Sequence, residues 1–183
     1  MPTLSTRDFT HVLPTLLTEL VHGSPNPEVG TYMLNRGDIG LLASLEKISA
    51  SGASATNQGG GSIASHVDHL RYGLSLLNRW ARGEETPWKD ADWTASWRIS
   101  AVDDEEWRRL RDALRLEADD WTEALRMPRD VHPAVLNWVV GSVAHLAYHV
   151  GAIRQIDRAS RGPTADDERR AEDALRAKIR TTG

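Results

Sequence analysis

The chain has 183 residues, of which 40% are hydrophobic and 26% charged, and its formal net charge is −4. These values are typical of one soluble globular domain and give no support to a basic nucleic-acid-binding surface. Cysteine is absent, which excludes disulfides, a thiolate nucleophile and a cysteine-based zinc site. The sequence has no run of about 18 apolar residues, so it predicts no membrane span. The N-terminus lacks the pattern of a secretion signal. We therefore expect a cytoplasmic protein with neither a membrane nor a nucleic acid as its partner.

Apolar residues recur at helical spacing in six segments, and no segment alternates as a strand does. Between the second and third segments, the Gly-, Ser- and Asn-rich residues 54–61 predict a flexible loop. Residues 84–102 predict a connection long enough either to cross the helices or to line a pocket. The predicted helices cover residues 8–21, 39–51, 63–82, 103–127, 133–159 and 164–180.

Several helix ends have recognisable signals. Ser62 is a predicted N-cap, and Gly83 follows the end of the same helix. Asp103 with Glu106 resembles a capping box, and Pro133 suits a first helical turn. The last helix is strongly charged with few apolar residues, so we expect it to be peripheral. The pattern as a whole predicts an all-α helix bundle.

Five of the seven tryptophans fall in one part of the chain. Because a large amphipathic ring suits half-buried positions, packing in the core and loops is the simpler interpretation. The alternative is a wall that contacts a ligand. The five are Trp80, Trp88, Trp93, Trp97 and Trp107.

His145 and His149 form an i, i+4 pair on the fifth predicted helix. This spacing puts both imidazoles on one face with their Cβ atoms about 6 Å apart. Two ring nitrogens can then reach one ion at about 2.0–2.1 Å each. His149 lies in the apolar stripe, and a buried imidazole needs partners for its nitrogens. A metal would supply them; the alternative is a pair of neutral core histidines bonded to their neighbours.

A third ligand would come from the helix at 63–82, which offers His66 and His69. At 100° per residue, His66 lies near the middle of the apolar arc and His69 nearer its edge, beside Gly73. Periodicity alone favours His66, whereas the space at Gly73 favours His69 as part of a pocket rim. The residues themselves leave this choice open.

Two short motifs give the chain a resemblance to the DinB/YfiT-like family of small bacterial helix-bundle proteins. Ser62-Ile-Ala-Ser-His-Val-Asp-His69-Leu70 resembles the family's pattern on its second helix. His145-Leu-Ala-Tyr-His149-Val-Gly151-Ala-Ile153 resembles its pattern on the last bundle helix. The motifs have the family's order and separation, and the helical layout extends the likeness over most of the chain.

The resemblance implies an up-down-down-up four-helix bundle with a divalent metal bound by His69, His145 and His149. It thereby selects His69 and leaves His66 as a supporting or alternative ligand. Zn²⁺ or Ni²⁺ is the implied ion, together with a low-molecular-weight thiol in some relatives. We expect a single domain over residues 1–183 with its core at about 38–160. The N-terminal segment is additional to this bundle, and the charged helix at 164–180 is peripheral.

The implied function is a metal-dependent enzyme, a thiol-dependent transferase or a hydrolase, that acts on a small-molecule substrate. The alternative is a non-catalytic stress-related or ligand-binding bundle with a structural metal or none. Asp68 and Asp92 are the carboxylates nearest in sequence to the histidines. A solvated-face role is the simpler interpretation for both, so no catalytic acid or base is assigned. Pairing through exposed helix faces makes a homodimer the candidate assembly.

Overall fold

The structure, a computed structural model, describes residues 6–24, 31–56, 60–129 and 132–181. Part of the predicted flexible loop, residues 57–59, lies outside the described residues. Within the described part of the chain, no helix combines the length and the apolar character that a membrane span requires.

Regular secondary structure in the described residues is entirely helical, which confirms the predicted all-α class. Two single 3₁₀ turns accompany the α-helices, η1 at Ala95–Trp97 and η2 at Arg158–Ser160. The α-helices are α1 (Thr6–His22), α2 (Gly40–Glu46), α3 (Ala50–Ser54), α4 (Ile63–Ala81), α5 (Asp104–Arg126), α6 (Pro133–Ile156) and α7 (Ala165–Thr181).

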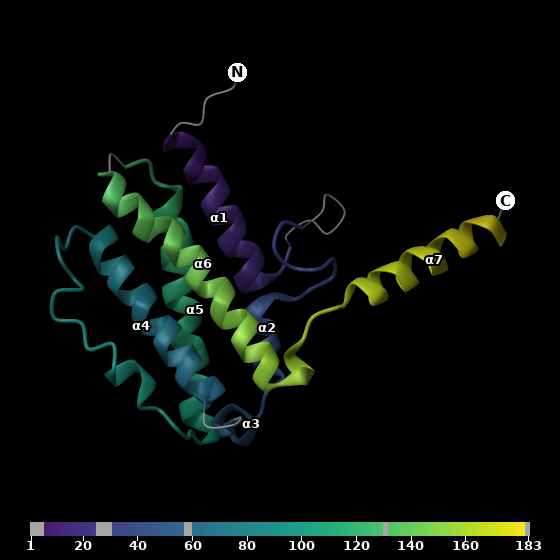
Figure 1. Cartoon of the computed structure of the whole chain (residues 1–183), viewed down its shortest axis with the longest axis horizontal. Coiled ribbons are helices and arrows are strands. Elements are labelled where there is room, and N and C mark those ends of the chain that lie inside the picture. The colour runs from purple at the N-terminus through teal and green to yellow at the C-terminus, as the bar shows by residue number, and fades with distance from the viewer. Residues whose placement is uncertain (1–5, 25–30, 57–59, 130–131, 182–183) are drawn as a thin grey trace.

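The four longest helices of the main body, α1, α4, α5 and α6, lie side by side around the core (Figure 1). Both α5 and α6 pack against α1 and against α4. Each of the four helices contributes leucines to the core that are at most 2% exposed, among them Leu17, Leu70, Leu114 and Leu146. This packing puts α4 in contact with α6, the two helices that carry the clustered histidines.

The ends of α4 and α5 fall where the capping residues predict them. Ser62 accepts a hydrogen bond from the N–H of Ser65 at the start of α4. The carboxylate of Asp103 accepts from the N–H of Glu106, whose own carboxylate accepts from the N–H of Asp103. This reciprocal pair is the predicted capping box. Gly83 follows α4 with a φ of 104°, a left-handed conformation that favours glycine.

The predicted helix at 39–51 is wrong in one respect, because the chain forms two short helices there. The N–H groups of Lys47 and Ile48 bond to carbonyls three residues earlier, which closes α2. Ser49 then adopts an extended backbone, and its side chain accepts a hydrogen bond from the N–H of Gly52 to begin α3. The apolar spacing continues across this break, so periodicity does not reveal it.

The first and last helices differ in how they join the main body. α1 lies within the N-terminal segment expected to be additional, and its leucines belong to the common core, at Leu13, Leu17 and Leu20. α7 extends away from the other helices (Figure 1), and none of its described residues belongs to that core. The carboxylate of Glu168 accepts a hydrogen bond from the backbone N–H of Arg36, which ties the start of α7 to the main body.

Candidate metal centre

Three of the clustered histidines meet between α4 and α6. His69 lies on α4, and His145 and His149 lie one turn apart on α6. One ring nitrogen from each lies within 4.8 Å of the others. His69 and His149 are buried, whereas His145 is exposed. The structure therefore brings together the three imidazoles expected to be metal ligands, while their binding of a metal stays a prediction.

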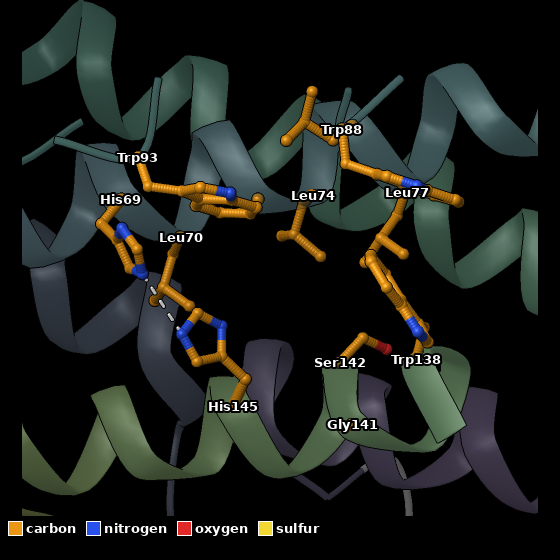
Figure 2. Close-up of a pocket in the computed structure, with 12 residues that line it drawn as sticks. His69, Leu70, Leu74, Leu77, Trp88, Trp93, Trp138, Gly141, Ser142 and His145 are labelled. Atoms are coloured by element: carbon orange, nitrogen blue, oxygen red, sulfur yellow. Dashed lines mark hydrogen bonds between the residues drawn. The ribbon is translucent and has the colours of Figure 1, made fainter. Parts of the chain in front are cut away.

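The nitrogens that converge are the three Nε2 atoms. The Nε2 of His145 lies 3.2 Å from that of His69 and 3.0 Å from that of His149; Figure 2 draws the first of these contacts. Two nitrogens bound to one ion at about 2.0–2.1 Å are about 2.8–3.4 Å apart, for angles from square to tetrahedral. These two separations therefore fit a shared divalent ion.

Hydrogen bonding alone does not account for both contacts of His145. A neutral imidazole carries one N–H and one lone pair. The Nε2 atom of His145 therefore offers either one hydrogen or one lone pair to two facing nitrogens. A linear hydrogen bond satisfies one of the contacts and leaves the other unmatched. A cation between the rings would pair with all three lone pairs, so the donor set suits a metal.

Ser96 fixes the position of the proton on His69. Its Oγ lies 2.9 Å from the Nδ1 of His69 and donates its hydrogen to the carbonyl of Trp93 at 2.7 Å. Because a hydroxyl has a single hydrogen, Ser96 accepts from the Nδ1–H of His69. The lone pair of His69 is therefore on Nε2, the atom that faces the cluster. Sequence reasoning missed Ser96, since no periodic pattern singles out a serine in the irregular stretch at 84–102.

His66 lies behind His149, outside the group of three. The two Nδ1 atoms are 2.8 Å apart, and both rings are buried. If the Nε2 of His149 presents its lone pair to the cluster, its Nδ1 carries the hydrogen and donates to His66. The geometry thus gives His66 a supporting position and gives His69 the place among the converging nitrogens.

The surroundings keep these imidazoles neutral. Desolvation lowers the pKa of the buried His66 below the ordinary value, and partial desolvation by the neighbouring groups does the same for the more exposed His145. Burial and the neighbouring imidazoles lower the pKa of His69 to about 4 and that of His149 to about 3. The neutral ring is the form that binds a metal, so the cluster holds its histidines ready for coordination.

The tryptophans differ in their surroundings. Trp97 stacks on the His69 ring, with centroids 4.5 Å apart and planes at 28°. Trp107 is buried in the core and donates its indole N–H to the carbonyl of Ile48. Trp80 is half-buried and packs against the hydrophobic core. Packing thus explains Trp80 and Trp107, whereas Trp97 belongs to the site.

A cavity of about 350 Å³ lies beside His69 and His145 (Figure 2). Its walls come from α4, from α6 and from the connection between α4 and α5, which therefore lines a pocket, one of its two predicted roles. The large apolar side chains in these walls are Leu70, Leu74, Leu76, Leu77, Trp88, Trp93 and Trp138.

The two nearby carboxylates are engaged in ion pairs. Asp68 pairs with Arg71 at 2.7 Å, and Asp92 pairs with Arg98 at 3.3 Å. The expectation of a solvated face holds for Asp92, which is exposed, and is wrong for Asp68, which is 8% exposed. Neither belongs to the group of converging ligand atoms found among the described residues.

Comparison with known proteins gives one match. The model of a family described as the DinB superfamily matches residues 36–153, which is more than half of the chain and includes the three converging histidines. No curated protein and no solved structure matches the chain.

Proposed function

Because the chain belongs to the DinB superfamily, we propose that His69, His145 and His149 hold a catalytic divalent metal ion and that the protein is a metal-dependent enzyme. Zn²⁺ and Ni²⁺ are the ions expected, since neutral imidazole suits both. Such an ion would supply Lewis-acid chemistry, by lowering the pKa of a bound water or by polarising a substrate carbonyl.

The observation that carries the proposal is the convergence of three Nε2 atoms with one side left open. His69 and His149 are buried, but His145 is exposed and lines the cavity. A site with three protein ligands keeps a coordination position for water or substrate, which distinguishes catalytic from closed structural metal sites.

Within this proposal, the reaction is a transfer or a hydrolysis on a small molecule. A low-molecular-weight thiol, as the family resemblance implies, would enter through the same open side. We also propose that the four bundle helices run in the order up-down-down-up. The course of the chain between α4 and α5 supports that order, because the connection runs back along α4 before α5 begins (Figure 1).

Metal content is the direct test. We expect about one ion per chain in the native protein and a large loss in His145→Ala and His149→Ala, because each removes one of three ligands. His11→Ala is the matched control, since His11 is an exposed histidine on α1, away from the cluster. Elemental analysis of the four proteins after gentle purification measures this. Equal metal content in all four proteins would contradict the proposal that these histidines bind a metal.

Coordination number then separates an enzyme from a structural site. In the Co²⁺-loaded protein, we expect the absorption spectrum to shift when a small exogenous ligand such as azide occupies the open position. A spectrum that no added ligand changes would indicate a closed, four-ligand ion and the non-catalytic alternative. The same titration with several low-molecular-weight thiols tests the thiol-dependent branch, in which an intense thiolate charge-transfer band is expected.

A further inference from the structure

The cavity beside the imidazoles has a polar end and an apolar body. His69 and His145 form one end, and Trp88 and Trp138 lie at the opposite end (Figure 2). The last two rings contact each other with their centroids 4.5 Å apart and their planes tilted by 40°, and Leu74 lies between the two ends. A volume of about 350 Å³ is in the range of pockets that bind small organic molecules.

The walls of the cavity carry no charge. Among the described residues, no Asp, Glu, Lys or Arg lines it. The hydroxyl of Ser142 donates to the carbonyl of Val139 at 2.6 Å and accepts from the indole N–H of Trp121 at 2.9 Å, so its hydrogen is already used. An ionised group among these apolar walls would lose its hydration without gaining a partner of opposite charge, which only the proposed ion at the histidine end could supply.

Building on the proposed metal centre, we propose that this cavity selects a substrate with an uncharged aryl or alkyl body and one polar group, such as a carbonyl. The body lies among the leucines and tryptophans, and the polar group points to the end formed by His69 and His145. Gly73 contributes to this selectivity, because it is a helical residue in the cavity wall whose missing side chain leaves room. A Cβ added there would meet its nearest neighbour, Trp93, only at 3.8 Å.

Three probes with a shared metal-binding nitrogen test the proposal. They are imidazole, 4-phenylimidazole, and 4-(imidazol-1-yl)benzoate, which adds a carboxylate to a similar body. On the Zn²⁺-loaded protein near pH 8, we expect 4-phenylimidazole to bind about tenfold or more tightly than imidazole, because its ring leaves water for an apolar wall. We expect the benzoate to bind more weakly than 4-phenylimidazole. Equal affinities, or tightest binding of the benzoate, would overturn the proposal; isothermal titration calorimetry measures all three.

Two variants locate the binding in this cavity. Gly73→Leu fills the space, and Trp138→Ala removes one aromatic wall from a residue that is 48% exposed and outside the buried core. Both should lower 4-phenylimidazole affinity about tenfold while metal content and imidazole affinity stay unchanged. Val140→Ala is the matched control, since Val140 is exposed on the same helix and does not line the cavity. Unchanged 4-phenylimidazole affinity in both cavity variants would overturn the proposal.

The experiment also distinguishes the two proposals from each other. If the native protein holds no metal, the proposed function is contradicted, but the proposal about the apolar cavity is not. In that case, the metal-free wild type is titrated with 4-phenylimidazole and with the benzoate. A preference for 4-phenylimidazole that Gly73→Leu abolishes upholds the cavity, and the lack of any preference overturns it.

Discussion

At the scale of single residues, the proton on His69 decides which nitrogen can bind an ion. The hydroxyl of Ser96 holds that proton on Nδ1, because its own hydrogen is given to the carbonyl of Trp93. Partners of this kind orient a ligand ring and select its tautomer, and their loss typically lowers metal affinity 10–100-fold. Ser96 is therefore a positioning residue for the candidate metal site.

We expect Ser96→Ala to weaken Zn²⁺ binding by about 10–100-fold, because His69 loses the acceptor for its Nδ1–H. Competition with a chromophoric chelator measures this affinity. Ser75→Ala is the matched control, since Ser75 bonds to a carbonyl of its own helix and touches no histidine in the site. A Ser96→Ala protein with native Zn²⁺ affinity would contradict the positioning role, whatever its thermal stability.

The lowered pKa values make the metal-free protein sensitive to acid. The pKa of His149 is lowered to about 3 and that of His69 to about 4, from an ordinary 6.5. As the pH falls below 6.5, these histidines become protonated in the unfolded chain but stay neutral in the folded chain. The free energy of unfolding therefore decreases. The stabilisation from neutral rings is complete above about pH 6.5 and is lost towards pH 4–3.

We therefore expect the urea midpoint of metal-free protein to fall between pH 7.5 and pH 5. His149→Gln, which carries no titrating ring at this position, should show a shallower fall over the same range. A wild-type midpoint that is flat across this interval would show that the rings titrate normally in the folded chain.

At the scale of elements, capping chemistry made the boundaries of α4 and α5 predictable. Ser62 and the pair Asp103 and Glu106 are local signals, because each bonds to a backbone group three residues away. The break between α2 and α3 was missed, because the same apolar spacing runs through Ile48 on both sides of it. The local signal that marks the break is Ser49, whose side chain accepts a hydrogen bond from the N–H of Gly52.

Glu19 shows how a long-range contact anchors an element. This α1 residue is 2% exposed, and its carboxylate accepts the backbone N–H groups of Tyr32, Met33 and Leu34 at 2.7–3.1 Å. An unpaired buried carboxylate would be costly, but three donors compensate for its lost hydration. Residues 32–34 are thus bound to α1 through the side chain of Glu19.

We expect Glu19→Ala to lower the free energy of unfolding by about 3 kcal/mol, because it leaves three backbone donors without their acceptor. Glu19→Gln keeps one acceptor oxygen and should cost less. Glu46→Ala serves as the control, because Glu46 forms only an exposed pair with Arg115 and such pairs contribute about 0–1 kcal/mol. Urea unfolding of the three variants measures the difference, and equal losses in Glu19→Ala and Glu46→Ala would contradict this account.

At the scale of the whole molecule, the site depends on the main body and not on α7. α4 and α6 carry the converging histidines and contact each other, whereas no described residue of α7 enters the core. The i, i+4 pair made two of the three converging histidines, His145 and His149, predictable from sequence. The expectation of His69 over His66 needed the family resemblance, because periodicity favoured His66, which the structure places behind His149 and outside the converging group.

Removal of residues 165–183 should therefore leave the metal content unchanged and lower the free energy of unfolding by about 1 kcal/mol or less. The loss corresponds to the exposed contact between Glu168 and Arg36. Chemical denaturation and elemental analysis of the truncated chain measure the two quantities. A large loss of either would show that α7 is part of the cooperative unit.

The stacking of Trp97 on His69 gives the chain an intrinsic optical reporter. Indole emission responds to the charge and to the electronic character of whatever touches its face. A paramagnetic ion such as Ni²⁺ would quench this tryptophan, whereas closed-shell Zn²⁺ would shift its emission without quenching it. Trp97→Phe would weaken the response and leave that of Trp93, whose ring lies 5.8 Å from the His69 ring, so fluorescence can distinguish the bound ions without any attached dye.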